Sequence, residues 1–183
     1  YWFGSKPAQG VPGDKIEMWF HGDEGTDRRL DEEFGPLHRT VTEKGVYSGI
    51  ASRLEKRREK IGLILLLDQL SRHLFRGEPA AYQQDERARD LASELIDSGE
   101  HRALSMWERA FVYLPFEHSE DLDDQNRSVE LFEQLLVECP ERWEEYAKDF
   151  LDYAREHRDV IREYGRFPHR NEILERTSSE SER

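Results

Sequence analysis

With 183 residues, the chain is long enough for one domain with a sizeable core, and its formal net charge of −13 disfavours a nucleic-acid partner held by phosphate contacts. The only cysteine, Cys139, excludes an internal disulfide and a cysteine-based metal cluster. No stretch reaches the roughly 18 apolar residues of a membrane span and no signal sequence opens the chain, so we expect a cytoplasmic protein without a membrane partner.

Short helices separated by breaking residues are predicted for the first part of the chain. The first follows Asp14 as its cap and continues to Phe20. The second covers Asp27–Phe34, and Gly35-Pro36 is expected to end it. Two further short pieces are expected at Leu37–Lys44 and Tyr47–Arg53.

A basic run precedes the most apolar stretch of the chain. Between Arg53 and Lys60 the sequence carries five basic and two acidic residues. Such a run favours a solvated connection leading into the next helix. An anion-attracting rim is the alternative interpretation.

Ile61–Gly77 is predicted to be the central helix, because it is too long and too apolar for a strand. On a helical wheel at about 100° per residue, its polar residues fall within an arc of roughly 140°. These are Asp68, Gln69, Arg72, His73 and Arg76. One or two turns earlier, the same arc contains the residues Ile61, Gly62 and Leu65. We therefore expect this side of the helix to begin inside the protein and to end at a polar cavity or its mouth.

Start and stop signals divide the remaining sequence into further helices. Asp85 is expected to cap one that Gly99 ends. Ser105 and Glu108 form a capping box that opens the next, which Pro115 is expected to kink.

The last two predicted helices lie on either side of Cys139-Pro140, and Gly165 is expected to end the second of them. Thr177–Arg183 is expected to be a disordered tail. No segment is convincing as a strand. We therefore predict an all-α protein whose single domain covers residues 1–176, with about eight antiparallel helices around the buried central one.

Four stretches together resemble a known bacterial family, which is identified only as domain-of-unknown-function family 924. They are Tyr1–Gly4, Leu65–Gly77 (LLLDQLSRHLFRG), Arg109–Leu122 (RAFVYLPFEHSEDL) and His157–Leu174 (HRDVIREYGRFPHRNEIL). The resemblance implies a TPR-like helical fold and no established activity.

The chain departs from the family pattern in two of these stretches. Leu70-Ser71 and His73 stand where relatives usually have Phe-Pro and Asn, and Tyr164 stands where Phe is usual. Without the proline, the central helix is expected to be more regular. The change to His73 puts a family-wide role for that position in doubt.

The polar residues of these stretches suggest a site for a small anionic ligand. We expect Arg72, Arg76, Arg166 and Arg170 to bind the anion bidentately. Asp68, Gln69 and Asn171 are the other expected ligand-binding residues. His118 or His169 is suited to proton exchange, with Glu117 or Asp121 orienting the histidine.

Two other interpretations stay open. The arginines and carboxylates are equally typical of structural ion-pair networks, and Asp68 and Arg72 have the spacing of an intrahelical pair. Ser119 or Asp121 is equally suited to capping the helix that follows. Alternatively, a TPR-like groove would hold a peptide or a partner helix without any catalytic activity.

No motif for a metal, a nucleotide or a serine nucleophile is present, so no cofactor is predicted. The sequence leaves enzymatic activity and oligomeric state open.

Overall fold

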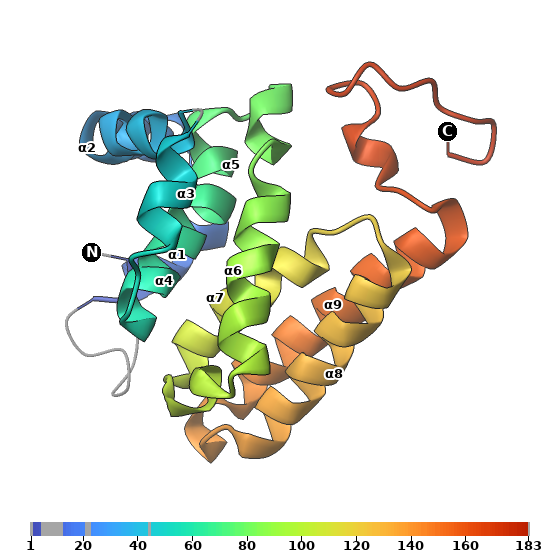
Figure 1. The fold of residues 1–183 in the computed structure, drawn as a ribbon. Coiled ribbons are helices and arrows are strands. Elements are labelled where there is room, and N and C mark those ends of the chain that lie inside the picture. Colours follow the sequence, from blue (N-terminus) through green and yellow to red (C-terminus); the bar gives the residue numbers. More distant parts are fainter. Residues whose placement is uncertain (1, 5–12, 21–22, 44, 183) are drawn as a thin grey trace. The chain divides into compact units, whose positions relative to one another are not determined.

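A computed structural model describes residues 2–4, 13–20, 23–43 and 45–182, and these residues form helices, turns and loops without a strand. The predicted all-α class is confirmed. The chain separates into two compact units, Tyr1–Val112 (unit 1) and Tyr113–Arg183 (unit 2) (Figure 1). The expected single domain over residues 1–176 and the TPR-like arrangement stay predictions.

Unit 1 contains most of the helices. These are α1 (Gly13–Phe20), α2 (Glu24–Thr42), α3 (Val46–Ala51), α4 (Arg57–Leu65), α5 (Ser71–Leu74) and α6 (Asp85–Asp97), with α7 (Met106–Glu117) crossing the boundary between the units. Short 3-10 turns lie at Pro79–Tyr82 and Glu100–Ala103, and a π-helical turn at Leu66–Leu70 joins α4 to α5. With α4, the π-helical turn and α5 counted as one helix, α1 to α9 of the described chain make eight helices.

The helix from α4 to α5 is the buried centre of unit 1, as predicted. Helices α2 and α6 pack against it, and its apolar side chains, such as Ile64 and Leu67, are fully buried. Its polar residues begin in the interior, where Asp68 is fully buried, and reach the surface at the exposed Arg76. The polar residues thus pass from the interior to the surface along this helix, and the polar cavity expected at its end stays a prediction.

This central helix is less regular than we expected. The π-helical turn replaces the α-helical pattern just before Ser71, the residue that stands where the family pattern usually has proline. The Ser71 hydroxyl donates to the Leu67 carbonyl oxygen at 2.6 Å. A polar side chain thus supplies a donor to the backbone at the point where the helical hydrogen-bond pattern changes.

Helix α2 corrects the prediction that Gly35-Pro36 ends a helix. It runs without a break from Glu24 to Thr42, so the piece expected at 27–34 and the expected second piece, from 37 as far as Thr42, are one helix. Lys44, the last residue of that second piece, lies outside the described residues. The Asp23 carboxylate accepts from the Thr26 amide at 2.8 Å and caps the start. Buried residues continue past the proline to His38 and Val41, and this packing offsets the one backbone donor that Pro36 removes.

Helix α6 also differs from its predicted start. It begins at Asp85, preceded by Gln84 as the N-cap residue, so Asp85 does not act as the cap. The Asp85 carboxylate accepts a hydrogen bond from Arg72 instead. The capping box of α7 is confirmed, because the Ser105 amide donates to Glu108 at 2.9 Å and the Glu108 amide donates to the Ser105 hydroxyl at 3.3 Å. Pro115 lies inside α7, which continues to Glu117.

Unit 2 is built on α8 (Leu122–Glu138) and α9 (Glu144–Tyr164), which pack side by side (Figure 1). The rings of Phe132 and Phe150 stack across them with centroids 5.7 Å apart. Asp121 caps α8, since its carboxylate accepts from the Asp123 and Asp124 amides. Short 3-10 turns lie at Glu141–Trp143 and Pro168–Arg170.

The disordered tail expected at Thr177–Arg183 stays a prediction. The structure describes this segment up to Glu182, and Glu182 forms an ion pair with Arg166. A bidentate contact between charged groups thus links this segment to Arg166.

Within the described residues, no helix is both long and apolar enough to cross a bilayer.

Candidate functional site

Arg72, one of the predicted site residues of unit 1, lies in an ion-pair network with Asp68 and Asp85. Its guanidinium donates to both carboxylate oxygens of Asp85, at 3.0 and 3.1 Å, and lies 3.1 Å from Asp68. Gln69 donates to the other Asp68 oxygen at 2.6 Å. Burial opposes the charge, but the two carboxylates outweigh it and raise the pKa of Arg72. Arg72 is thus held by protein carboxylates.

Arg76 is held in the same way by Asp27. Its Nε and Nη2 atoms donate to the two Asp27 oxygens at 2.6 and 3.0 Å, and His73 Nδ1 donates to Asp27 at 2.7 Å. Burial works against the Asp27 charge, but the hydrogen bonds from Arg76 and His73 lower the pKa of this carboxyl below its ordinary value. His73, which replaces the usual asparagine, therefore contacts the start of α2.

Two of the predicted residues of unit 2, Arg170 and His118, contact each other. Arg170 Nη2 donates to the His118 carbonyl oxygen at 3.0 Å, and its guanidinium lies 4.4 Å from the Phe167 ring centroid. The Phe167 amide donates to Glu120 at 3.0 Å. The EHSED and RFPHRN stretches, about fifty residues apart in sequence, therefore meet around Phe167.

Two histidines flank the Phe167 ring. His157 and His169 have ring centroids 5.5 and 5.4 Å from it. His157 also faces Glu117, with Nδ1 and Oε1 3.6 Å apart, although the sequence predicted that Glu117 would orient His118 or His169. Partial desolvation of the otherwise exposed His169, and then the nearby Arg170 charge, lower the pKa of the His169 imidazole. At neutral pH this ring is uncharged and able to accept a proton.

Arg166 binds a carboxylate in the geometry of ligand recognition. Its Nε and Nη2 atoms donate to the two Glu182 oxygens at 2.6 and 2.8 Å. The Ser179 amide donates to the same carboxylate at 2.6 Å. The bonds from Arg166, then from the Ser179 backbone, hold the pKa of Glu182 far below its usual range, and the Asn171 side chain contributes in the same direction. Only 3% of the Glu182 side chain is exposed.

Asn171 and Arg176 complete this part of unit 2. Asn171 is buried and donates to the Ser178 hydroxyl at 3.1 Å. Its Oδ1 atom is buried without a hydrogen-bond partner among the described residues. Arg176 binds both oxygens of Glu120, at 2.9 and 2.8 Å. We call Arg166, Asn171, Ser179 and Glu182 the Arg166 site.

The predicted residues thus fall into two groups, one in each unit. Three of the four arginines face carboxylates of the chain, and Arg170 faces a carbonyl oxygen. A single pocket that contains all of them stays a prediction. Sequence reasoning missed the three acidic partners Asp27, Asp85 and Glu182, because none has a helical spacing to its arginine.

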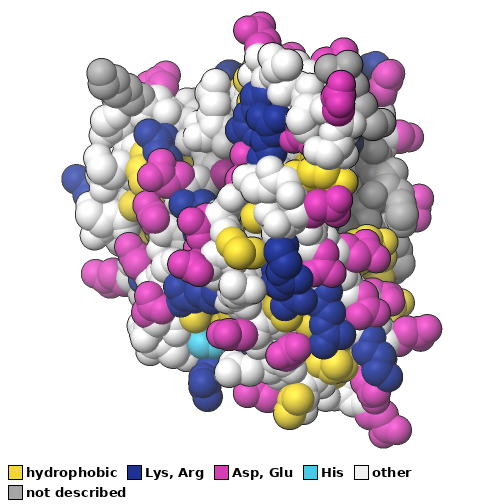
Figure 2. Space-filling model, turned by 90° about the vertical axis from the view of Figure 1, so that its right-hand side faces the viewer, with side chains coloured by type: hydrophobic (Ala, Val, Ile, Leu, Met, Phe, Trp, Pro, Cys, Tyr) yellow, Lys and Arg dark blue, Asp and Glu magenta, His cyan; other side chains and the backbone are white. Residues whose placement is uncertain are grey.

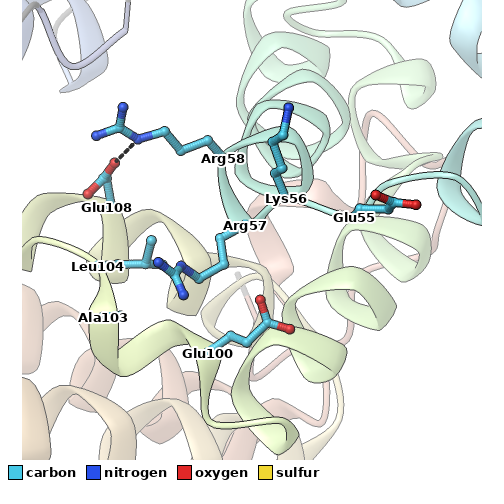
Figure 3. A pocket seen from close by; sticks show the side chains of 8 residues that line it. All are labelled: Glu55, Lys56, Arg57, Arg58, Glu100, Ala103, Leu104 and Glu108. Atoms are coloured by element: carbon cyan, nitrogen blue, oxygen red, sulfur yellow. Dashed lines mark ion pairs between the residues drawn. The ribbon is translucent and has the colours of Figure 1, made fainter.

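A cavity of about 470 Å³ lies elsewhere in unit 1 (Figure 3). Its lining residues come from the segment before α4, the first two residues of α4, the 3-10 turn before α7 with the residue that follows it, and the start of α7. They are Glu55, Lys56, Arg57, Arg58, Glu100, Ala103, Leu104 and Glu108. None belongs to the predicted site. The three basic ones belong to the run interpreted as a solvated connection or an anion-attracting rim.

On the face drawn in Figure 2, acidic and basic side chains are interspersed, and no broad patch of a single charge is present there. Among the described residues, no group of three or more His, Cys, Asp or Glu side chains is arranged to hold a metal ion.

Comparisons with known proteins agree with the fold. A family model described as a bacterial protein of unknown function, DUF924, matches residues 1–183. The solved structure of a protein of unknown function from Agrobacterium tumefaciens is 35% identical, with a TM-score of 0.77 over 93% of this chain and 86% of that one. None of the curated proteins matches the chain.

Proposed function

The chain belongs to the bacterial DUF924 family of unknown function, and from this premise we propose that it binds a small anionic ligand, a carboxylate, at the Arg166 site. The observation that carries the proposal is the carboxylate of Glu182 in the guanidinium fork of Arg166, at 2.6 and 2.8 Å. Paired, parallel N–H donors are the arrangement by which arginine recognises carboxylates.

The surroundings of Arg166 favour an anion. The Ser179 amide and the Asn171 side chain act on the same carboxylate as the guanidinium. Asn171 is 1% exposed, and its Oδ1 atom has no hydrogen-bond partner in the described part of the chain. A ligand that carries a hydroxyl or amine next to its carboxylate supplies the donor that this oxygen lacks.

In this proposal Glu182 occupies the site as an internal substitute for the ligand. A group tethered in the same chain competes at an effective concentration on the order of millimolar. A small carboxylate therefore binds the unaltered protein weakly, and removal of the Glu182 charge opens the site.

We propose binding without a chemical step. His118 and His169, predicted for proton exchange, lie in unit 2 near Arg170 and Phe167. His169 has a lowered pKa, so it stays uncharged at neutral pH and adds no charge to the anion site.

The test uses Glu182→Gln, which keeps the shape of the side chain and removes its charge. We expect acetate, lactate or succinate to raise the melting temperature of Glu182→Gln more than that of the unaltered protein. Arg166→Ala combined with Glu182→Gln abolishes the increase. Calorimetric titration then gives the affinity of each variant.

The matched control is Arg162→Ala, because Arg162 pairs with Asp159 at 2.6 Å on the exposed side of α9. Its ligand response is expected to equal that of the unaltered protein. The proposal is wrong if no carboxylate stabilises Glu182→Gln beyond the double variant. That outcome leaves the peptide-binding alternative, which a library of short peptides would then examine.

A further inference from the structure

The cavity in unit 1 has the size and rigid surroundings of a ligand site. Its volume of about 470 Å³ falls within the range of small-molecule pockets, roughly 300–1,000 Å³. The capping box of Ser105 and Glu108 fixes one wall, since the Ser105 amide and hydroxyl both donate to Glu108, at 2.9 and 2.7 Å. Glu108 is buried, so this wall is part of the folded core.

The cavity carries a positive charge that the chain leaves unpaired. Arg57 forms no ion pair with any residue that the structure describes, whereas its neighbours do. Lys56 lies 3.6 Å from Glu59, and Arg58 lies 3.8 Å from Glu108. Figure 3 shows the Arg57 side chain extending toward Leu104 at the cavity wall.

The same cavity carries negative charge that is also unpaired. Glu55 and Glu100 make no ion pair within the described ranges, and the Glu100 carboxylate accepts a hydrogen bond from the Ser98 hydroxyl at 3.5 Å. Glu100 projects from the 3-10 turn, separately from Arg57 (Figure 3). Opposite charges therefore line one cavity without neutralising each other.

We propose that this cavity binds a small zwitterion of the amino-acid type. The ligand carboxylate pairs with Arg57, and its ammonium group pairs with Glu100. Leu104 and Ala103, the apolar residues of the lining, contact its side chain. A molecule with both charges satisfies both groups at once, whereas a simple anion leaves Glu100 unpaired and close to a like charge. This site is independent of the Arg166 site.

The experiment compares L-leucine with two analogues that each lack one charge. N-acetyl-leucine keeps only the carboxylate, and leucinamide keeps only the ammonium group. Calorimetric titration of the intact protein is expected to show L-leucine binding at least fivefold more tightly than either analogue. Equal affinity for N-acetyl-leucine and L-leucine would overturn the proposal of a zwitterionic ligand. The absence of any L-leucine binding would also overturn it.

Variants locate the binding. Arg57→Gln is expected to weaken L-leucine binding at least fivefold and to leave leucinamide binding unchanged. Glu100→Gln is expected to weaken leucinamide and L-leucine alike. Arg53→Gln, in the same basic run but outside the cavity lining, is the control and keeps full affinity. If Arg57→Gln and Arg53→Gln behave alike, the assignment to this cavity is wrong.

These results are distinguishable from those at the Arg166 site. Leucinamide has no carboxylate and does not compete with Glu182, so its binding reports on the cavity alone. Conversely, the acetate response of Glu182→Gln is expected to be the same with and without Arg57→Gln. A loss of that response in Arg57→Gln would contradict two independent sites.

Discussion

At the scale of single residues, His38 and Ser71 form a buried polar pair whose role is structural. His38 Nε2 and Ser71 Oγ are 2.8 Å apart, and the Ser71 hydroxyl donates to the Leu67 carbonyl oxygen. Because the hydroxyl proton is used there, His38 donates from Nε2. Both residues are buried, at 2% and 0% exposure, so a substrate does not reach this serine.

This pair predicts acid sensitivity of unit 1. Burial, and then the charge of Arg39, lower the pKa of His38 below 6.5. The folded state therefore binds fewer protons than the unfolded chain as the pH falls, and stability is lost from about pH 6.5 down through the folded pKa. His38→Gln, whose amide nitrogen replaces Nε2, is expected to reduce this loss, measured by urea unfolding between about pH 7.5 and 5.

The comparison variant for this prediction is His157→Gln, at a partly exposed histidine of unit 2. It is expected to leave the acid-induced loss in unit 1 unchanged. An identical pH profile for His38→Gln and the unaltered protein would show that other groups control the acid response.

Glu175 carries the second prediction at this scale. Its φ of 54° lies in the left-handed region, which is unfavourable for a residue with a Cβ atom. Glycine adopts this conformation without strain, so Glu175→Gly is expected to raise the free energy of unfolding by about 0.5–1 kcal/mol. Glu172→Gly, whose residue lacks a positive φ, is expected to lower it. Denaturant unfolding measures the free energy of unfolding of both variants. If Glu175→Gly destabilises the protein, the backbone at Glu175 is not strained.

The ion pairs show which contacts sequence spacing is able to predict. The Asp68–Arg72 pair follows from four-residue helical spacing and is present at 3.1 Å. Asp27 and Asp85 bind arginines from other elements, so no helical period indicates them. The sequence thus predicted the arginines as important polar groups and left ion-pair networks open as their role, but it did not identify Asp27 and Asp85 as the partners.

At the scale of elements, α2 shows packing outweighing local preference. Gly35 and Pro36 both disfavour helix, yet α2 passes through them. Asp31 and Arg39 form an ion pair at 2.9 Å, and both side chains lie close to the Cβ position that Gly35 lacks. The glycine therefore leaves room for a surface ion pair, which the breaker signal in the sequence does not reveal.

Gly35→Ala follows from this arrangement. An added Cβ displaces the ends of two flexible, half-exposed side chains, and an exposed pair of this kind is worth about 0–1 kcal/mol. Alanine gains up to about 1 kcal/mol of helix propensity over glycine. We expect the free energy of unfolding to change by between 0 and about +1 kcal/mol. Asp31→Asn with Gly35→Ala, which removes the pair beforehand, should show the full gain.

If Gly35→Ala lowers the free energy of unfolding by more than about 1 kcal/mol, the ion-paired side chains or the nearby backbone do not move to make room for the added Cβ atom.

The π-helical turn limited the prediction of the central helix. A helical wheel at constant angle assumes uninterrupted α-helix, whereas Leu66–Leu70 closes wider i→i+5 turns. The polar residues after the turn are therefore rotated relative to those before it. The predicted arc captured the passage from buried Asp68 to exposed Arg76, but it could not predict that Arg72 and Arg76 bind different acidic partners.

At the scale of the whole molecule, the helical class and several helix termini followed from the sequence. The cap at Asp121, the capping box at Ser105 and the stop at Gly165 are all local signals, and all three are present. The site depends on contacts between distant segments. Arg166 and Glu182 are sixteen residues apart, on either side of a turn whose path depends on the fold. A single sequence contains no signal for such a pair.

Net charge gives the last prediction. The chain carries 40 acidic and 27 basic residues, so even full pairing leaves an excess of 13 carboxylates. Their mutual repulsion destabilises the compact state, and salt screens it over a Debye length that falls from about 30 Å at 0.01 M to about 10 Å at 0.1 M. Salt also weakens the exposed ion pairs, but each is worth only about 0–1 kcal/mol.

We therefore expect added salt to stabilise the protein. Raising NaCl from about 0.01 to about 0.2 M should increase the melting temperature by about 2–4 °C, which corresponds to roughly 1 kcal/mol for a chain of this size. Tetramethylammonium chloride at equal ionic strength is expected to act equally, because screening does not depend on a specific cation. A falling melting temperature would show that pairs such as Arg166–Glu182 and Arg72–Asp85 contribute more than the long-range repulsion. Scanning calorimetry in both salts distinguishes the two outcomes.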